Sequence, residues 1–221
     1  MKDLILNYVS DRGGGAQINV LDLGCSGGGF VKSILDSGDI AVGLEGSDYS
    51  KIMKRAEWRT IPEYLFTCDI TRRFQIYENG KPMKFDVVTA WEVMEHINSY
   101  DVPKVAENVK KHLKIGGLWI MSVSNNSDIH EGKELHQSQQ SKDLWIKQFE
   151  KLGFHNHEEL VSYFKTQFVR GKWETPIYFH LVLSTEKEAH AVPHDTILES
   201  IGDYWIGTRW QKILKIIVCG Y

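Results

Sequence analysis

The sequence predicts an α/β fold built on a mostly parallel, doubly wound sheet, and two observations carry that prediction. The first is a series of short runs rich in Val, Ile and Leu, each bounded by turn signals, at residues 18–23, 40–44, 64–68, 85–90 and 118–123. Apolar runs of this length indicate strands that are buried on both faces. The second is that helical patterns lie between these runs, and alternating strands and helices form parallel sheets through right-handed crossovers.

The clearest helical pattern is DVPKVAENVKKHLKIGG, residues 101–117. Its apolar residues at 102, 105, 109 and 113 share one face, with Asp101 as the expected N-terminal cap and Gly116 as the expected end.

The alternation changes after residue 123. Residues 124–140 are polar and predict a loop, and SKDLWIKQFEKLGF (141–154) predicts an amphipathic helix closed by Gly153. Residues 160–164 and 177–184 are expected to pair as an antiparallel hairpin around RGKWETP. The sheet is therefore expected to end in antiparallel strands.

Composition and charge exclude several classes of protein. The chain has 221 residues with 42% hydrophobic content, enough for one sizeable core, and a formal net charge of -3 without the basic patch of a nucleic-acid-binding protein. No apolar stretch is long enough to span a membrane, and the first residues do not have a signal-peptide pattern. The three cysteines fit neither a zinc site nor a disulfide framework, so we expect free thiols and a cytoplasmic protein.

A glycine-rich turn, VLDLGCSGGGF at residues 20–30, follows the first predicted strand. A dinucleotide site requires G-x-G-x-x-G, and Ser26 stands at the second glycine of that pattern. A P-loop is excluded because no Lys-Ser/Thr pair follows the glycines. Asp22 favours a ligand without phosphate, because a carboxylate at the strand's end can orient an ammonium group but opposes a pyrophosphate.

This stretch resembles motif I of the class I S-adenosylmethionine-dependent methyltransferases. The resemblance continues in register: Glu45 ends the second strand about 20 residues beyond the turn, where an acid accepts from ribose hydroxyls, and Asp69 ends the third, where the family binds adenine. FDVVTAWEVMEHI and HLKIGGLWIMSV look like the fourth and fifth strands. The resemblance covers residues 18–125 in detail and extends to about residue 185. It implies a Rossmann-like, seven-stranded sheet with S-adenosylmethionine as cofactor.

The resemblance implies a set of cofactor-binding residues, namely Asp22, Gly24, Cys25, Ser26, Gly28, Glu45, Gly46, Ser47, Asp69, Ile70, Ala90 and Trp91. Some of them have a second interpretation. Asp69 could be an ordinary turn residue, and Trp91 could belong to the core or could pack on the adenine ring or the sulfonium. Cys25 is interpreted as a small residue of the turn and not as a reactive thiol.

Two histidines are the candidate catalytic residues. His96 lies in the turn after the fourth strand, which faces the methyl group in the family, and an imidazole can accept a proton near neutral pH. His136 lies in the polar loop where small-molecule members of the family contact substrate. The alternatives are a structural hydrogen bond for His96 and a solvated loop for His136. The spacing of His130, Glu131 and His136 matches no metal site, so none is predicted.

WEVMEHI and HQSQQSKDLWIKQFEKLGF resemble methyltransferases that act on hydroxyls of metabolites and saccharides. This resemblance implies a small-molecule acceptor, with a hydroxyl of a sugar or related metabolite as the expected methylated group. The turn after the fourth strand reads AWEV, without the Asn/Asp-Pro-Pro-Tyr/Phe pattern of nucleic-acid amino-methyltransferases. Two other functions remain open from the sequence: a nicotinamide-dependent oxidoreductase, and a catalytically silent member that serves as a binding subunit.

We expect two parts in the chain, a methyltransferase domain at 1–185 and a helical appendage at 186–221. The appendage has two apolar stripes at helical spacing within residues 195–217. Apolar stripes facing water form a patch that monomers rarely expose. We expect them to be covered either by the chain's own core or by the same segment of a second subunit, and we favour the homodimer.

Overall fold

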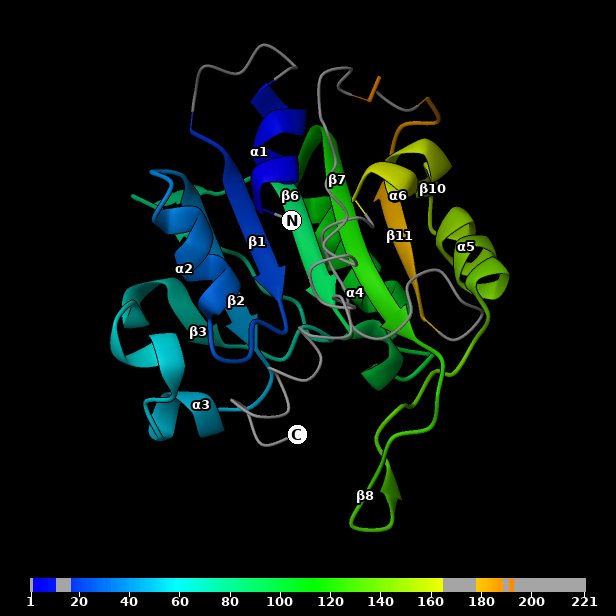
Figure 1. Cartoon of the computed structure of the whole chain (residues 1–221), viewed down its shortest axis with the longest axis horizontal. Coiled ribbons are helices and arrows are strands. Elements are labelled where there is room, and N and C mark those ends of the chain that lie inside the picture. Colours follow the sequence, from blue (N-terminus) through cyan, green and yellow to red (C-terminus); the bar gives the residue numbers. More distant parts are fainter. Residues whose placement is uncertain (1, 11–16, 165–177, 189–190, 193–221) are drawn as a thin grey trace, which may run out of the picture.

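The strands form one mixed sheet. The computed structural model describes residues 2–10, 17–164, 178–188 and 191–192 (Figure 1). Within them, the seven-stranded sheet has the order β3-β2-β1-β6-β7-β11-β10. Its strands are β1 (Asn19–Leu23), β2 (Ile40–Glu45), β3 (Leu65–Thr67), β6 (Phe85–Trp91), β7 (Leu113–Ser124), β10 (His155–Asn156) and β11 (Tyr178–Ser184). The first five pair in parallel and β11 is antiparallel to both β7 and β10, which confirms the predicted fold class.

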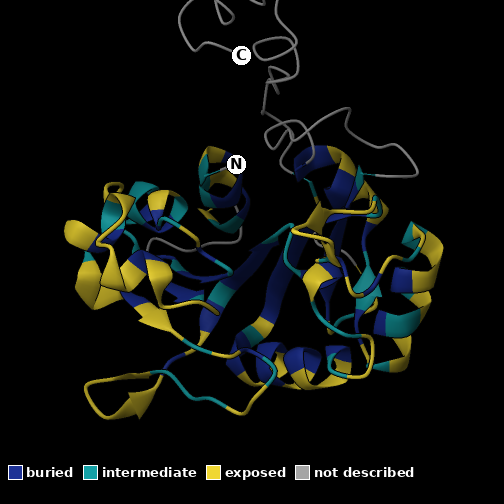
Figure 2. Ribbon diagram, turned by 90° about the horizontal axis from the view of Figure 1, so that it is seen from below, coloured by how far each residue is buried: buried dark blue, intermediate teal, exposed yellow. Residues whose placement is uncertain are grey.

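Helices cover both faces of the sheet (Figures 1 and 2). One face carries α1 (Lys2–Ser10), α2 (Gly29–Leu35) and α6 (Glu158–Phe164), and the other carries α4 (Val102–His112) and α5 (Lys142–Lys151). Short elements complete the described fold: α3 (Tyr49–Ile52), the 3-10 turns η1 (Ala56–Arg59), η2 (Pro62–Tyr64) and η3 (Met94–His96), and the hairpin strands β4 (Tyr77–Glu78), β5 (Lys81–Pro82), β8 (Ile129–His130) and β9 (Lys133–Glu134).

The strand sequences explain the two cores. Successive side chains of a strand point to opposite faces. In β7, Trp119 therefore packs in the cluster beneath α4 and α5, while Ile120 packs in the cluster beneath α1, α2 and α6. Leu21 and Val20 of β1 divide in the same way. Both faces must be apolar, which is why these strands are continuous hydrophobic runs.

The helix after residue 101 ends earlier than predicted. α4 ends at His112 and not at Gly116, because Leu113 adopts an extended conformation and pairs with Phe85 as the first residue of β7. Gly116 has φ +69° within that strand, beside an irregularity in the register of β6 and β7. The apolar periodicity that predicts a longer helix thus continues from α4 into the first residues of β7, where the strand pairing is irregular. The helix predicted within residues 141–154 is confirmed as α5. The Ser141 side chain caps it by accepting from the backbone N–H of Leu144, and Gly153 follows its end with φ +76°.

The predicted C-terminal hairpin is wrong in one strand. Residues 160–164 belong to α6, where Leu160, Val161 and Phe164 form an i, i+1, i+4 apolar stripe that packs against α1. The strand that pairs with β11 on its outer edge is β10, at residues 155–156. A five-residue run such as LVSYF fits a buried strand and a helix equally well by periodicity, so only packing decides between them.

Two elements, α1 and the β4–β5 hairpin, were not predicted, although the sequence contains a signal for each. In α1, Leu4, Ile5 and Tyr8 are buried at helical spacing, and the Tyr163 hydroxyl donates to the carbonyl of Leu4. The β4–β5 hairpin turns at Asn79-Gly80, both with positive φ. Asn-Gly is the strongest short hairpin signal in a sequence.

The proposed appendage falls largely outside the described residues. Only 186–188 and 191–192 of it are described, so the boundary at residue 185 and the homodimer through 195–217 stay predictions. Among the helices that the structure describes, none has the length and apolar character needed to cross a bilayer.

The aromatic contact between α5 and the sheet gives a test of the fold. Phe149 is fully buried, 5.0 Å from the Trp119 ring in an edge-to-face contact and 5.5 Å from the Trp145 ring. We predict that Phe149→Ala lowers the free energy of unfolding by about 3–5 kcal/mol, through lost burial and a residual cavity. Urea unfolding measures the change, and Lys147→Ala on the exposed side of α5 is the matched control. A loss below about 1 kcal/mol would show that α5 does not pack as described.

Candidate active site

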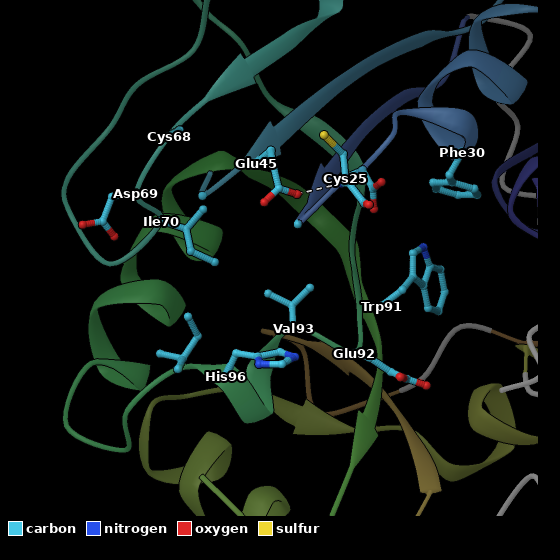
Figure 3. Close-up of a pocket in the computed structure, with 15 residues that line it drawn as sticks. Cys25, Phe30, Glu45, Cys68, Asp69, Ile70, Trp91, Glu92, Val93 and His96 are labelled. Atoms are coloured by element: carbon cyan, nitrogen blue, oxygen red, sulfur yellow. Dashed lines mark hydrogen bonds between the residues drawn. The ribbon is translucent and has the colours of Figure 1, made fainter. Parts of the chain in front are cut away.

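A cavity of about 750 Å³ opens at the carboxyl edge of the sheet (Figure 3). This volume is within the range of about 300–1,000 Å³ that small-molecule sites occupy. The residues that line it are Asp22, Gly24, Cys25, Ser26, Phe30, Glu45, Gly46, Cys68, Asp69, Ile70, Trp91, Glu92, Val93, His96 and Ile97. Most of them lie at the carboxyl ends of β1, β2, β3 and β6 or in the turns that follow, where ligands of open α/β sheets bind, and Phe30 comes from α2.

The turn after β1 is fastened to β2. The backbone N–H groups of Gly24 and Cys25 both donate to the carbonyl of Leu44, at 2.7 and 3.0 Å. Gly24 has φ +70°, and a Cβ there would lie 2.4 Å from Cγ2 of Val93. Glycine is therefore required twice at this position, by the backbone conformation and by the close approach of Val93.

The glycine in the middle of β2 makes room for the same turn. A Cβ on Gly43 would lie 2.8 Å from both Cβ and Sγ of Cys25. Cys25 is buried, and burial raises the pKa of its thiol far above the ordinary value. A thiol that stays protonated is a poor nucleophile, in keeping with the interpretation of Cys25 as a small turn residue.

Asp22 is a buried carboxylic acid at the end of β1. Its Oδ1 accepts a hydrogen bond from Thr89 Oγ1 at 2.7 Å. Its pKa is raised to about 7, mainly by burial and in smaller part by the charge of Glu45, against the opposing effect of the Thr89 hydrogen bond. A cationic ligand group beside Asp22 would reverse this effect, because an opposite charge favours the ionised acid.

The Glu45 side chain links the turn after β1 to the turn after β2. Its Oε2 accepts from the backbone N–H of Ser26 at 2.8 Å, drawn as the dashed line in Figure 3, and its Oε1 accepts from that of Ser47 at 3.2 Å. A carboxylate has about four acceptor positions, so both oxygens can also accept from ligand hydroxyls.

Asp69 makes the contacts of a turn residue and also lines the cavity. Its Oδ1 accepts from the backbone N–H and the hydroxyl of Thr71, and these hydrogen bonds lower its pKa. The next residue, Ile70, is fixed by a side chain of α4. Nδ2 of the buried Asn108 donates to the carbonyls of Ile70 and Arg72, at 3.0 and 2.7 Å. The segment after β3 is thus fixed by α4 in the position where it borders the cavity.

Apolar and aromatic side chains form the remaining walls. Trp91 and Phe30 meet edge to face with ring centroids 5.9 Å apart, on the opposite side of the cavity from Asp69 and Ile70 (Figure 3). Trp91 is only partly buried and lines the cavity, which favours its interpretation as a ligand-packing residue.

The two predicted catalytic histidines are neighbours. The rings of His96 and His136 meet edge to face with centroids 4.7 Å apart, although α4, β7 and the β8–β9 hairpin lie between the two residues in the chain. His96 lines the large cavity, and its Nδ1 lies 3.2 Å from the carbonyl of Leu135. Burial, followed by the proximity of His136, lowers the pKa of His96. His136 instead lines an adjoining cavity of about 310 Å³, which shares Glu92 and His96 with the larger one.

Three of the predicted cofactor residues do not line the large cavity. Gly28 starts α2 at φ +83°, with Leu65 where its Cβ would be. Ser47 donates its backbone N–H to Glu45, and Ala90 is fully buried behind Trp91 in β6. They support the walls of the cavity and do not form its surface.

Five lining residues were not predicted from the sequence, namely Phe30, Cys68, Glu92, Val93 and Ile97. Glu92 and Val93 follow the fourth strand directly, so the strand-end rule that found Trp91 could have found them. Glu92 has φ +52°, a conformation that is uncommon outside glycine and clusters at functional sites. Among the described residues, no three His, Cys, Asp or Glu side chains are grouped as a metal site requires.

Known proteins share both the sequence pattern and the fold. The sequence profile of a family described as a methyltransferase domain matches residues 1–174. The chain belongs to this family. As a class I, S-adenosylmethionine-dependent methyltransferase domain it has the cofactor that the sequence predicted, and the family favours this function over the nicotinamide-dependent alternative.

Two curated relatives are ubiquinone biosynthesis O-methyltransferases. The one from Serratia proteamaculans is 28% identical over 125 residues, covering 56% of this chain and 50% of the relative. The one from Vibrio cholerae is 29% identical over 126 residues, covering 56% of this chain and 49% of the relative. The chain therefore matches about half the length of these relatives.

Solved structures match over more of the chain. An S-adenosylmethionine-dependent methyltransferase from Clostridium acetobutylicum superposes with a TM-score of 0.57 at 16% identity, covering 82% of this chain and 89% of that one. The glycopeptide N-methyltransferase MtfA, solved with S-adenosyl-L-methionine, gives a TM-score of 0.54 at 15% identity, covering 81% and 92%. At this identity the likeness shows the fold.

The raised pKa of Asp22 generates a pH-dependent prediction. With a pKa of about 7, Asp22 is mostly protonated at pH 6 and mostly ionised at pH 8.5. If the ammonium group of S-adenosylhomocysteine binds beside it, the carboxyl must lose its proton. We predict release of close to one proton per ligand at pH 6 and almost none at pH 8.5, so affinity rises with pH across this range.

Calorimetry in buffers of different ionisation enthalpy measures the released protons. Asp22→Asn should bind more weakly and release no proton, while the exposed control Asp48→Asn should behave as the parent. Equal proton release by the parent and Asp22→Asn would contradict the assignment of Asp22 to the ammonium group.

Proposed function

We propose that the chain methylates a hydroxyl of a small molecule, with S-adenosylmethionine in the large cavity and the acceptor beside the two histidines. The observation that carries the proposal is the arrangement of Asp22, Glu45 and Asp69, which end three neighbouring strands around one cavity. The names of the curated relatives favour oxygen as the methylated atom. The finer suggestion of a sugar or related metabolite rests on the sequence resemblance.

The three acids suit the three parts of the cofactor. Asp22 would hold the ammonium group directly or through water, Glu45 the ribose hydroxyls, and the segment at Asp69 and Ile70 the adenine. The residues of the first turn would bring backbone groups close to the amino-acid end, and the aromatic wall at Trp91 would exclude water from the reacting centre. The bound cofactor supplies an electrophilic methyl group on a sulfonium.

His96 is the proposed general base. If its Nδ1 carries the proton donated to the Leu135 carbonyl, its Nε2 has the lone pair that can accept a proton from the acceptor hydroxyl. The lowered pKa keeps this imidazole neutral at pH 7, the form in which it acts as a base. His136 packs against the ring edge and would position it.

The first test asks which cofactor binds. Calorimetry should detect S-adenosylhomocysteine at micromolar dissociation constants, about -8 kcal/mol, and neither NAD nor NADP. Glu45→Ala should weaken this binding by about 1–3 kcal/mol, because two charge-assisted hydroxyl contacts are lost. The exposed Glu63→Ala is the control. Parent-like affinity in a folded Glu45→Ala variant would refute the ribose assignment.

The second test addresses the base. We predict that His96→Ala lowers turnover by about 10²-fold with little change in cofactor affinity, because a base acts in the transition state. In the parent, kcat/KM should fall only below pH 6.5, the ordinary pKa of an imidazole, since the base must be neutral and its pKa is lowered.

The practical assay is S-adenosylhomocysteine release with a panel of simple glycosides and hydroxylated metabolites. His130→Ala, on the exposed hairpin strand β8, should leave turnover unchanged. Unchanged turnover in His96→Ala would leave positioning as the whole mechanism. A chain that binds the cofactor but turns over no acceptor would instead agree with a catalytically silent binding subunit.

A further inference from the structure

The 3-10 turn η1 holds the carbonyl groups of the glycine-rich turn after β1. The indole Nε1 of Trp58 donates to the carbonyl of Ser26 at 2.8 Å, and the backbone N–H of Glu57 donates to the carbonyl of Gly27 at 2.9 Å. Neither Trp58 nor Glu57 is among the residues that line the large cavity. Two successive carbonyls of the turn are therefore fixed from outside the cavity, by a segment that follows the second strand of the sheet.

Close packing accompanies these hydrogen bonds. A Cβ on Gly27 would lie 3.0 Å from Cβ of Ala56, and a Cβ on Gly28 would lie 3.3 Å from Cβ of Glu57. Trp58 is 3% exposed and belongs to the core cluster beneath α1, α2 and α6. The indole of a buried tryptophan usually needs a hydrogen-bond partner, and Trp58 finds it in the turn. Core packing thus directs its N–H group at one backbone acceptor.

Ser26 has a backbone conformation that depends on support from its neighbours. Its φ is +48°, in the left-handed region that residues with a Cβ seldom adopt. Such a conformation persists where the surrounding structure enforces it. The N–H of Ser26 donates to Oε2 of Glu45, and its carbonyl accepts from Trp58, so side chains hold the residue at both of its peptide groups. Trp58 supplies the contact on the carbonyl side.

The support reaches the cofactor cavity through Ser26. Ser26 and Glu45 both line this cavity, and they are joined by the hydrogen bond from the Ser26 N–H. A rotation of Ser26 out of the left-handed region would turn its peptide groups away from Glu45 and from Trp58. The carboxylate proposed for the ribose would then lose the donor that orients it. Trp58 therefore acts on two groups that border the cavity without bordering it itself.

We infer that Trp58 is a positioning residue for S-adenosylmethionine, whose indole N–H keeps Ser26 in the left-handed conformation and so keeps the turn in the form that binds the cofactor. The inference rests on the proposed function only in placing the cofactor in the large cavity, and it is independent of the acceptor and of the histidines. Without this hydrogen bond, part of the free protein leaves the binding form. The apparent dissociation constant then rises in inverse proportion to the fraction that remains.

Trp58→Phe tests the inference, because it keeps an aromatic ring in the core and removes the N–H donor. We expect calorimetry on the full chain to give a dissociation constant for S-adenosylhomocysteine about tenfold higher than that of the parent. Trp145→Phe is the matched control. Trp145 is fully buried in α5 on the other face of the sheet, and its Nε1 has no hydrogen-bond partner among the described residues. This variant should lose stability in urea but bind like the parent.

A double-mutant cycle with Ser26→Gly separates positioning from loss of core packing. Glycine adopts positive φ without the cost that a Cβ imposes, so it needs less support from Trp58. In the Ser26→Gly background, Trp58→Phe should therefore raise the dissociation constant by only about threefold or less. A loss that came from the core alone would be the same in both backgrounds.

The results decide between these two roles. Parent-like affinity in a folded Trp58→Phe variant overturns the inference, and so does an equal loss of affinity in Trp145→Phe. An equal rise in both backgrounds of Ser26 overturns the proposed action through its conformation. If Trp58→Phe does not fold, Trp58→Met replaces it with the same expected rise, because methionine also lacks the donor and fills irregular core space. Parent binding is measured first, so its absence is a failure of the proposed function and is separate from these results.

Discussion

Three successive backbone N–H groups donate to the end of the neighbouring strand, and the site depends on them. Those of Gly24 and Cys25 converge on the Leu44 carbonyl, and that of Ser26 reaches the Glu45 side chain. Turns usually leave such groups to water, but here they join the first crossover to the second strand. The hydrogen bonds place the backbone of Gly24, Cys25 and Ser26 beside the carboxylates of Asp22 and Glu45.

The cavity is held from both sides of this turn. On the side of Asp69 and Ile70, α4 fixes the segment after β3: Asn108 binds two of its carbonyls, and Nε2 of His112 accepts from the backbone N–H of Ile76 at 3.3 Å. The ring of His112 also stacks on Phe74, with centroids 4.7 Å apart. On the side of His96 and His136, Glu134 hydrogen-bonds two backbone N–H groups of the loop between β7 and α5. Elements outside the cavity therefore help to determine its shape.

The sequence predicts the strand ends well because their signal is local. Buried parallel strands must be apolar on both faces, so a polar residue near the end of such a run (Asp22) or directly after it (Glu45 and Asp69) marks the carboxyl edge of the sheet. Three such positions in order were enough to predict one cavity. The same locality explains the length error at His112, because helix periodicity continues into a strand start whose pairing with Phe85 is a contact between distant residues.

Other features depend on contacts that no local pattern records. The run at 160–164 becomes a helix through packing on α1. His96 and His136 were predicted separately, and their 4.7 Å ring contact depends on the path of the polar loop after β7 that carries His136. Glu134 fixes that path by accepting from the backbone N–H groups of Asp128 and His136, and no sequence pattern around Glu134 indicates this role.

The absence of a side chain at Gly43 has an evolutionary consequence. Because a Cβ there would lie 2.8 Å from Cys25 and equally close to Cδ2 of Leu65, three positions on two strands and a turn share one small volume. A larger residue at 43 requires a smaller one at 25 or 65, so these positions should covary among homologues. The space beside Gly43 then limits the size of the residue at position 25. The cysteine found there reflects this packing constraint and not a chemical role.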